Sequence, residues 1–551
     1  MLIRGRLALS LFIMVSAAAL VAAGQTTASA PQPRPEQTAL RDAMKLTDPA
    51  AKLKALDDVI AKYPDATSLV DVCATKIATL QAIQPVDLAA VDAAIAKARV
   101  VKTPRTPHEV LNLLAITLMN APETIGRAEA LDREAIAMLD EATYVRDWQA
   151  RFVKNPNDPK EVVAQAKEGK SRFLGTNSIY HLYLARILLK AGRDAEAKAE
   201  FETSLTFNPL QGSAALALAG MAEKAGDAAE AYKRLSWAAV TGRLTDADRP
   251  RLDAAYAKAH AGAKPGDVEA DLDRLYRDSF KNPITTGRYA PSKARTNRVV
   301  LAEMFTGAGC VPCLSTDLSF EAMLDRYTRK DLVVLMYHIH APTPDPLSNA
   351  SVQARGKYYN VNSAPTTFID GTPETIEGPR ADAPETFITL DAVVGHHLEE
   401  ASVASIKLSA TMRGSVVTAQ AEVAGVPAGS ADLRIQLVLV EQLVRYSGEN
   451  GQRFHPMVTR AFGGTDMNGW AIEGSNRTRV AHAFDLDALA AGNLKYYDDY
   501  ALDMKTRIGL GVSFHEKKHV IDPKNVAVVA FVQDVKTRRV LQAAWVTPGT
   551  R

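Results

Sequence analysis

The spacing of apolar and polar residues changes character several times along the chain. Residues 7–23 form one short apolar run, and no later run is long and apolar enough to span a membrane. From about residue 37 to residue 280, Ala, Leu, Glu and Lys dominate and β-branched runs are almost absent, which predicts helices. From about residue 404, apolar and polar positions alternate over short stretches, which predicts strands. The pattern therefore indicates a multidomain chain, helical first and rich in strands later.

The first apolar run is typical of a secretory signal. Arg4 and Arg6 precede it and small residues follow it, so we expect a signal peptide over residues 1–24 and a flexible leader over 25–36. A membrane anchor is the alternative, but the run is short for a spanning helix. The mature protein is then periplasmic or secreted, with the periphery of the outer membrane as a further location. No stable membrane span is expected.

The charge balance and the cysteine count argue against two classes of protein: those that bind nucleic acids and those whose fold depends on several disulfide bonds. The chain has 65 basic and 63 acidic residues, so removal of Arg4 and Arg6 leaves 63 of each. A neutral mature chain argues against a nucleic-acid partner, which requires excess Lys and Arg. Only three cysteines occur, at positions 73, 310 and 313, so no disulfide framework stabilises the fold. Cys73 lies in an apolar helical stretch and is interpreted as a buried small side chain.

A repeat is visible within the helical region, residues 37–280. Its members are small or apolar residues that recur thirty-four positions later: Leu184, Ala185, Gly192, Ala195, Glu196, Ala197 and Phe201 correspond to Leu218, Ala219, Gly226, Ala229, Glu230, Ala231 and Leu235. The period resembles the tetratricopeptide repeat, a pair of helices that stacks into a solenoid. The resemblance implies an all-α solenoid with a concave face for a protein partner. A helical spacer without a ligand is the alternative.

Three further segments follow the helical region. Residues 281–298 are basic and rich in Pro, Gly, Ser and Thr, which indicates a linker, and residues 299–400 begin an α/β pattern. Residues 401–551 predict about eight strands, with Asn450-Gly451 as a hairpin turn and one strand over 508–514. This spacing favours an antiparallel β-sandwich. His515-Glu516-Lys517-Lys518-His519 fits a zinc-protease motif, but we interpret it as a charged β-hairpin because the motif requires a helix.

The clearest chemical motif is Cys310-Val311-Pro312-Cys313. It follows the strand expected from residue 299 and opens a helix, where unpaired N–H groups and the helix dipole lower the pKa of a thiol. Two intervening residues place the second sulfur close enough for a disulfide bond. We therefore expect Cys310 to be the exposed nucleophile and Cys313 the shielded resolving thiol. No cofactor and no metal site are expected.

A second motif lies downstream, where Tyr359-Asn360-Val361 precedes Ala364-Pro365-Thr366 and an apolar strand that ends in Asp370-Gly371. Together the two motifs resemble the thioredoxin family over residues 296–400. The resemblance implies a thioredoxin-like α/β domain in which Pro365 is cis and lies beside the cysteines, and in which the backbone of Ala364 pairs with a substrate. Gly309 replaces the usual Trp. The acidic residue of the preceding strand is not at its usual spacing. Glu303 lies one position further back and is the candidate base, with a solvent-facing carboxylate at the strand end as the alternative.

The combination of a thioredoxin-like module and a C-terminal β domain also resembles a group of exported, outer-membrane-related bacterial proteins. The favoured function is a cell-envelope thiol–disulfide oxidoreductase that acts on protein thiols or disulfides, with a partner held by the helical repeats. A non-catalytic scaffold is the first alternative. A copper-handling chaperone is the second, because His338 and His340 would face one side of a strand near Cys310 and Cys313.

Overall fold

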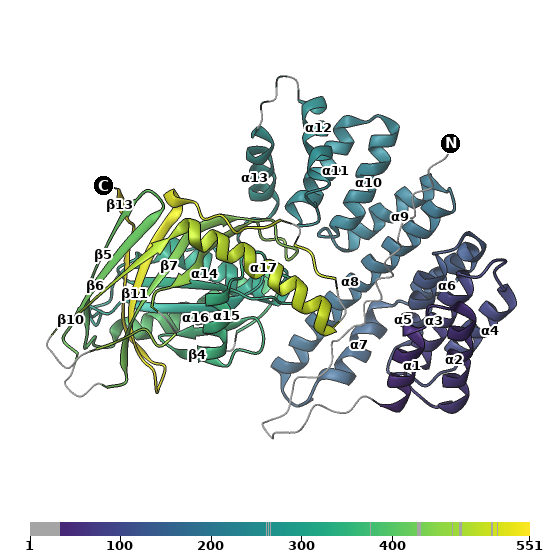
Figure 1. The fold of residues 1–551 in the computed structure, drawn as a ribbon, viewed down its shortest axis with the longest axis horizontal. Coiled ribbons are helices and arrows are strands. Elements are labelled where there is room, and N and C mark those ends of the chain that lie inside the picture. Colours follow the sequence, from purple (N-terminus) through teal and green to yellow (C-terminus); the bar gives the residue numbers. More distant parts are fainter. Residues whose placement is uncertain are drawn as a thin grey trace. The chain divides into compact units, whose positions relative to one another are not determined.

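The structure is a computed structural model that describes residues 34–260, 262, 264, 266–374, 376–426, 431–464, 467–472, 477–508, 511–514 and 516–550. The predicted signal peptide and most of the predicted leader lie outside the described residues. The chain divides into two compact units, residues 1–135 and residues 136–551 (Figure 1). Thirteen α-helices precede the first strand in the described part, so the helical N-terminal region of the sequence analysis is confirmed.

The first unit consists of short helices with well-formed N-termini. Asp48 and Asp87 each accept a hydrogen bond from a backbone N–H of the first turn, and Thr106 forms a capping box with Glu109. Cys73 is buried, as expected, and burial raises the pKa of its thiol to about 11. The helices are α1 Pro35–Lys45, α2 Pro49–Lys62, α3 Leu69–Gln81, α4 Leu88–Arg99, α5 Pro107–Leu118 and α6 Ile125–Ala137, with a 3-10 turn at Pro122–Thr124.

The second unit opens with helices that carry the predicted repeat. Gly192 and Gly226, thirty-four positions apart, both adopt a left-handed conformation at the turn after a helix, where glycine is favoured. Phe201 and Leu235, also equivalent, are both fully buried. These helices are α7 Glu141–Phe152, α8 Pro159–Lys190, α9 Asp194–Phe207, α10 Gly212–Ala225, α11 Ala228–Val240, α12 Arg249–Ala259 and α13 Asp267–Ser279.

A nine-stranded sheet forms the centre of the second unit. Its strand order is β12-β11-β7-β8-β2-β1-β3-β4, with β9 paired to β7. Strands β1 and β2 are parallel, and β2 meets β8 through Met336 and Val458. Strands before and after residue 401 therefore share one sheet. The strands are β1 Val300–Thr306, β2 Leu332–His338, β3 Thr366–Ile369, β4 Thr372–Glu374, β7 Leu433–Arg445, β8 Phe454–Phe462, β9 Trp470–Ala471, β11 Val526–Asp534 and β12 Val540–Val546.

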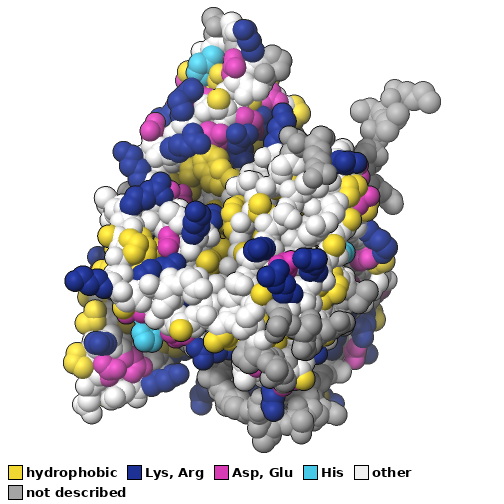
Figure 2. All heavy atoms as spheres, turned by 90° about the vertical axis from the view of Figure 1, so that its left-hand side faces the viewer, with side chains coloured by type: hydrophobic (Ala, Val, Ile, Leu, Met, Phe, Trp, Pro, Cys, Tyr) yellow, Lys and Arg dark blue, Asp and Glu magenta, His cyan; other side chains and the backbone are white. Residues whose placement is uncertain are grey.

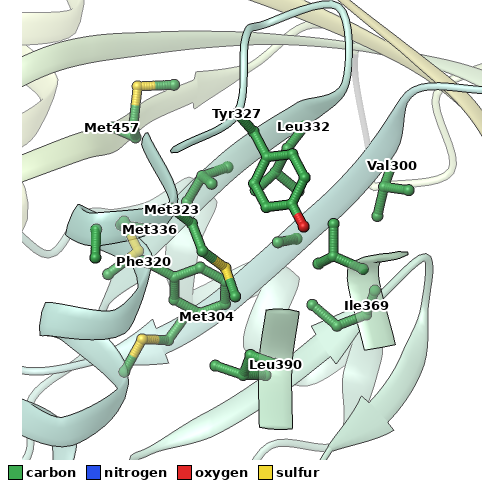
Figure 3. Close-up of a cluster of buried hydrophobic side chains, with 14 of the residues drawn as sticks. Val300, Met304, Phe320, Met323, Tyr327, Leu332, Met336, Ile369, Leu390 and Met457 are labelled. Carbon is green, nitrogen blue, oxygen red and sulfur yellow. The ribbon is translucent and has the colours of Figure 1, made fainter. Parts of the chain in front are cut away.

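Apolar side chains cover both faces of strands β1 and β2. Helices α14, Leu314–Arg326, and α16, Ala383–Glu399, pack on one face, while α15, Ala350–Tyr359, packs on the other. The apolar core between these strands and helices α14 and α16 also contains Cys310 and Cys313. Figure 3 shows how its larger side chains lie among one another: Val300, Met304, Phe320, Met323, Tyr327, Leu332, Met336, Ile369, Leu390 and Met457.

A second sheet has the order β10-β6-β5-β13. Its β5–β6 hairpin turns at Gly414, which has a positive φ of 57°, as the expected turn requires. Apolar residues of β6 share a buried cluster with residues of β7 and β11 from the first sheet. The strands are β5 Ser405–Arg413, β6 Val416–Ala424, β10 Arg477–Asp485 and β13 Gly549–Thr550.

Helix α17, Leu486–Ile508, was not expected from the sequence. Its first turn is capped by Asp485, which accepts hydrogen bonds from the backbone N–H groups of Asp487 and Ala488 at 3.0 and 3.1 Å. The segment is also rich in Ala and Leu, which are good helix formers. Local capping and propensity thus produce a helix before the stretch where alternation predicted a strand.

The strand predicted over residues 508–514 is wrong, because residue 508 ends the helix and residues 511–514 belong to no strand. Residues 516–520 are also outside any strand or helix, so the β-hairpin expected around the zinc-protease motif is wrong for the described residues. His515 lies outside them. Alternation alone does not make a strand without a neighbouring strand to pair with.

The surface carries charges of both signs. On the face drawn in Figure 2, Asp and Glu side chains are interspersed among the Lys and Arg side chains. Within the described residues, no helix is both long and apolar enough to cross a membrane.

Candidate redox site

The loop that carries the two cysteines lies between the end of strand β1 and the start of helix α14. A single 3-10 turn, Val311–Cys313, leads directly into the helix. Cys310 and Cys313 are joined by a disulfide bond, with 5.4 Å between their Cα atoms. Unpaired N–H groups at a helix N-terminus stabilise negative charge. Reduction of the bond would therefore place a thiolate beside the positive end of α14.

The cysteines are less accessible than the sequence analysis expected. Cys310 is 3% exposed and Cys313 is fully buried, so an exposed Cys310 is wrong for the disulfide form. The loop packs closely on the segment after β2, where a Cβ atom on Gly309 would lie 2.4 Å from Oγ1 of Thr343. Val311, 46% exposed, and Pro312, also exposed, are the residues of the motif that meet solvent. A molecule that reaches the disulfide from solvent therefore meets these two residues first.

The segment before strand β3 lies against the first cysteine. The Ala364–Pro365 peptide bond is cis, as the sequence predicted. The carbonyl oxygen of Ala364 is 3.8 Å from Sγ of Cys310. Ala364 and Pro365 are half-buried, whereas Asn362 is exposed. The structure thus brings three of the four predicted site residues together, namely Cys310, Cys313 and Pro365.

Glu303, the fourth predicted site residue, lies in a different environment. Its carboxylate is fully buried and Oε1 accepts hydrogen bonds from Nη2 of Arg355 at 2.6 Å and from the Tyr337 hydroxyl at 2.7 Å. The Tyr359 hydroxyl donates to Oε2 at 2.7 Å. The alternative of a solvent-facing carboxylate at the strand end is therefore wrong.

The direction of the Glu303 side chain separates it from the cysteines. Successive residues of a strand face opposite sides of the sheet, and the neighbouring Met304 belongs to the apolar core that contains Cys313. Glu303 consequently faces the other side of β1, and the structure does not bring it to either sulfur. The spacing between Glu303 and the CxxC motif suggested a base. The alternation of side chains along β1 instead points Glu303 to the face of the sheet opposite the cysteines.

Asp317 is the carboxyl group on the cysteine side of the sheet. Its side chain is 1% exposed, and Oδ2 accepts a hydrogen bond from Oγ1 of Thr306, the last residue of β1, at 3.1 Å. Oδ1 is buried and has no hydrogen-bond partner among the described residues. Asp317 follows Cys313 by four positions at the start of α14, and this spacing places two side chains next to each other on a helix.

The environment of Asp317 favours its protonated form. Burial raises the pKa of Asp317 to about 7, and the opposing effects of His338 and the Thr306 hydroxyl are smaller. A carboxyl group with such a pKa can both accept and donate a proton near neutral pH. Among the described residues near the cysteines, Asp317 therefore has the chemistry that the sequence analysis sought in Glu303.

A charged carboxylate supports the cysteine loop from the other side. Oδ2 of Asp345 accepts a hydrogen bond from the N–H of Ala308 at 2.6 Å and lies 2.9 Å from Nδ1 of His338. Burial works to raise the pKa of Asp345, but His338 and the N–H groups of Ala308 and Leu347 outweigh it and hold this pKa below its ordinary value. The carboxylate therefore stays ionised and restrains the loop.

The two histidines of the copper-handling alternative each have another polar neighbour. Nδ1 of His338 lies 2.9 Å from Oδ2 of Asp345, and Nε2 of His340 lies 2.8 Å from the Tyr496 hydroxyl. Burial lowers the pKa of His340 to about 4. Within the described part of the chain, no three His, Cys, Asp or Glu side chains come together as metal ligands.

Asn450 also belongs to this site, because its backbone N–H donates to the carbonyl oxygen of Ala308 at 3.1 Å. Sequence reasoning missed Asp317 and Asp345, and it gave Asn450 only as a turn residue. An acidic residue in the first turn of a helix is common on protein surfaces because it complements the helix dipole, so Asp317 carried no distinctive signal. Asp345 and Asn450 reach the cysteine loop only through the folded chain. No protein-family model matches the chain, and no curated protein is significantly similar to it.

Proposed function

We propose that the protein is a thiol–disulfide oxidoreductase with a thioredoxin-like domain over residues 299–400. The observation that carries the proposal is the Cys310–Cys313 pair at the start of α14, with the carbonyl oxygen of Ala364 3.8 Å from Sγ of Cys310. The helix start favours a thiolate, and a backbone carbonyl beside it can pair with an extended substrate. Both features serve the exchange of a disulfide with another protein.

In the reducing direction, the proposed reaction starts from the dithiol form of Cys310 and Cys313. The Cys310 thiolate attacks one sulfur of a substrate disulfide, whose S–S bond breaks, and the second substrate sulfur leaves as a thiolate that takes a proton from solvent. Cys313 then loses its proton and attacks Sγ of Cys310, which restores the protein disulfide and releases the first substrate sulfur as a thiolate. This thiolate also takes a proton from solvent. One substrate disulfide becomes two thiols while the protein dithiol is oxidised. The oxidising direction reverses these steps.

Asp317 is proposed as the group that accepts the Cys313 proton. Its free, buried Oδ1 and its position one helical turn after Cys313 support this role, as does its pKa of about 7. A base with a pKa near the operating pH is the most effective proton acceptor. Solvent reaches a fully buried thiol poorly, so resolution depends on this internal acceptor.

The helical repeats are proposed to hold the substrate protein. The paired helices α8 to α11 have the thirty-four-residue period of tetratricopeptide repeats, and a tethered partner would have a high effective concentration near Cys310. We extend the proposal to a solenoid for these repeats and to a β-sandwich for residues 401–551. We also propose a periplasmic or secreted location on the basis of the predicted signal peptide.

The decisive experiment is a mixed-disulfide trap. A Cys313→Ala variant can attack a substrate disulfide but cannot resolve the product, so it should accumulate covalent adducts with envelope proteins that reducing agent releases. The matched control is the double variant Cys310→Ala/Cys313→Ala, which keeps only the buried Cys73 and should trap nothing. Reduction of insulin by the wild-type protein provides an independent measurement.

The rival function is a non-catalytic scaffold with a thioredoxin-like fold. It predicts equal yields of adduct for the trap and the double variant, and no insulin reduction above background. That pair of results would replace the enzymatic proposal with the scaffold.

A further inference from the structure

The turn between strands β7 and β8, residues 446–453, contacts the cysteine loop. The backbone N–H of Asn450 donates to the carbonyl oxygen of Ala308 at 3.1 Å. The Asn450 side chain is fully buried, and its Nδ2 lies 3.4 Å from the carbonyl oxygens of both Gly307 and Cys310. A single amide therefore spans the loop from its first residue to the reactive cysteine.

At Gly448 the turn and the cysteine loop are too close to admit a side chain. A Cβ atom on Gly448 would lie 2.3 Å from the carbonyl oxygen of Ala308, well inside van der Waals contact. Oδ1 of Asn450 accepts a hydrogen bond from the N–H of Gln452 at 3.0 Å, which orients the amide so that its NH₂ group faces the loop. The turn is thus shaped to present Asn450.

The opposite side of the same turn is held by the helical region. Gly242, at the end of α11, has a φ of 71°, and a Cβ atom there would lie 2.6 Å from the backbone of Gly448. Arg243 pairs with Glu449 at 3.1 Å. At the end of the turn, Nε of Arg453 donates to Asp273 of α13 at 2.9 Å, and this pair is almost fully buried.

We infer that Asn450 is a positioning residue for the redox reaction, and that the β7–β8 turn transmits restraint from helices α11 and α13 to the cysteine loop. The amide fixes the carbonyl groups of Gly307 and Cys310, and thereby the direction of the Cys310 side chain. Because the same turn is clamped by the helices, a change in the helical region alters the relative stability of the dithiol and disulfide forms. The inference rests on the proposed function in one respect, since the pair must cycle between these forms.

The test measures the equilibrium between the cysteine pair and glutathione in Asn450→Asp. This substitution keeps the shape and the acceptor for Gln452 but replaces the NH₂ donor with an oxygen that repels the two carbonyl groups and a Cys310 thiolate. The disulfide form should be favoured at least threefold, about 14 mV in reduction potential at about 30 mV per tenfold change. Leu443→Ala, an exposed position on β7 of the same hairpin, is the matched control and should leave the potential unchanged.

Arg243→Ala tests the helical side without touching the loop. It removes the partially exposed pair with Glu449 and should shift the potential as well, by less than Asn450→Asp, while thermal unfolding shows that both variants fold. Potentials equal to those of wild type and Leu443→Ala in both variants would overturn the inference. The proposed function fails separately: a protein that neither reduces insulin nor forms trapped adducts, but whose potential responds to Asn450→Asp, retains the inference and loses the activity.

Discussion

Two buried carboxyl groups on opposite faces of the sheet at strand β1 have opposite surroundings: Glu303 of β1 and Asp317 of α14. Glu303 accepts hydrogen bonds from Arg355 and from two tyrosine hydroxyls, and Arg355 is itself fully buried. Asp317, on the other side of the sheet, has one hydroxyl donor and an oxygen without a partner. The two groups are equally inaccessible to solvent. What distinguishes them is the number of donors that the fold provides.

The number of donors around a buried acid decides whether it serves structure or chemistry. A buried carboxylate that an arginine and two hydroxyl groups contact is fixed in place by those donors and ties together the elements that carry them. When burial is the main influence on the pKa of a carboxyl group, that pKa is raised. Asp317 is such a group and exchanges protons near neutral pH. Glu303 therefore belongs to the framework of the sheet, and Asp317 belongs to the redox site.

The largest expected effect comes from removing the arginine that forms an ion pair with Glu303. Arg355→Met would leave the Glu303 carboxylate buried without its cation, which should lower the free energy of unfolding by about 3–5 kcal/mol. Urea unfolding at pH 7 measures the loss. The double variant Glu303→Leu/Arg355→Met removes both charges and should regain most of the stability. A loss below about 1 kcal/mol for the single variant would show that the pair is not structural.

The raised pKa of Asp317 should make the free energy of unfolding depend on pH. The pKa of Asp317 is about 7 in the folded protein and near the ordinary 3.8 when unfolded, so the folded state binds more protons between these values. Protonated Asp317 contributes its full share to the free energy of unfolding below about pH 4. This contribution is lost as the pH rises through 7, and the total loss is roughly 4 kcal/mol. Asp317→Asn should lack this loss.

Unfolding curves for the wild-type protein and Asp317→Asn at pH 4, 5.5, 7 and 8 provide the measurement. The difference between the two should grow in favour of Asp317→Asn up to about pH 7 and then stay constant. A difference that is independent of pH would mean that Asp317 titrates alike in both states, and the contrast with Glu303 would disappear.

The same substitution should slow the chemistry. Without a proton acceptor at position 317, the attack of Cys313 on the mixed disulfide should slow by about 100-fold at pH 7, the usual range for loss of a general base being about 10²–10⁴. Single-turnover release of a purified mixed disulfide isolates this step. The first attack, by Cys310, should keep nearly its wild-type rate, and an equal slowing of both steps would argue for a general distortion of the loop instead.

The parts of this site that the sequence predicted are local ones. Cys310, Cys313 and the cis peptide bond before Pro365 follow from short motifs whose geometry the neighbouring residues determine. The roles of Glu303 and Asp317 do not, because each depends on which donors the fold brings near. Arg355 is fifty-two positions from Glu303, so nothing in its spacing announced the pair.

The same distinction holds for the fold. Helices in the first half and the β5–β6 hairpin follow from periodicity and turn residues. The joining of β2 to β8 depends on residues 336 and 458, more than a hundred positions apart, and no alternation pattern encodes such a pairing. Asn450 was recognised as part of a turn signal, but its buried contacts with the cysteine loop emerge only once those strands meet.

The smallest expected effect comes from an exposed ion pair. It tests whether ion pairing without burial stabilises the fold as much as the buried pair of Glu303 and Arg355. Lys495 and Asp499 form an ion pair at 2.5 Å on α17, in the same unit, with side chains 74% and 61% exposed. Lys495→Met should change the free energy of unfolding by less than about 0.5 kcal/mol, because water already solvates both charges and the mobile side chains lose entropy in pairing. Urea unfolding under the conditions used for Arg355→Met gives the comparison. Similar losses in the two variants would mean that burial adds nothing, and the contrast between paired and unpaired buried acids would lose its physical basis.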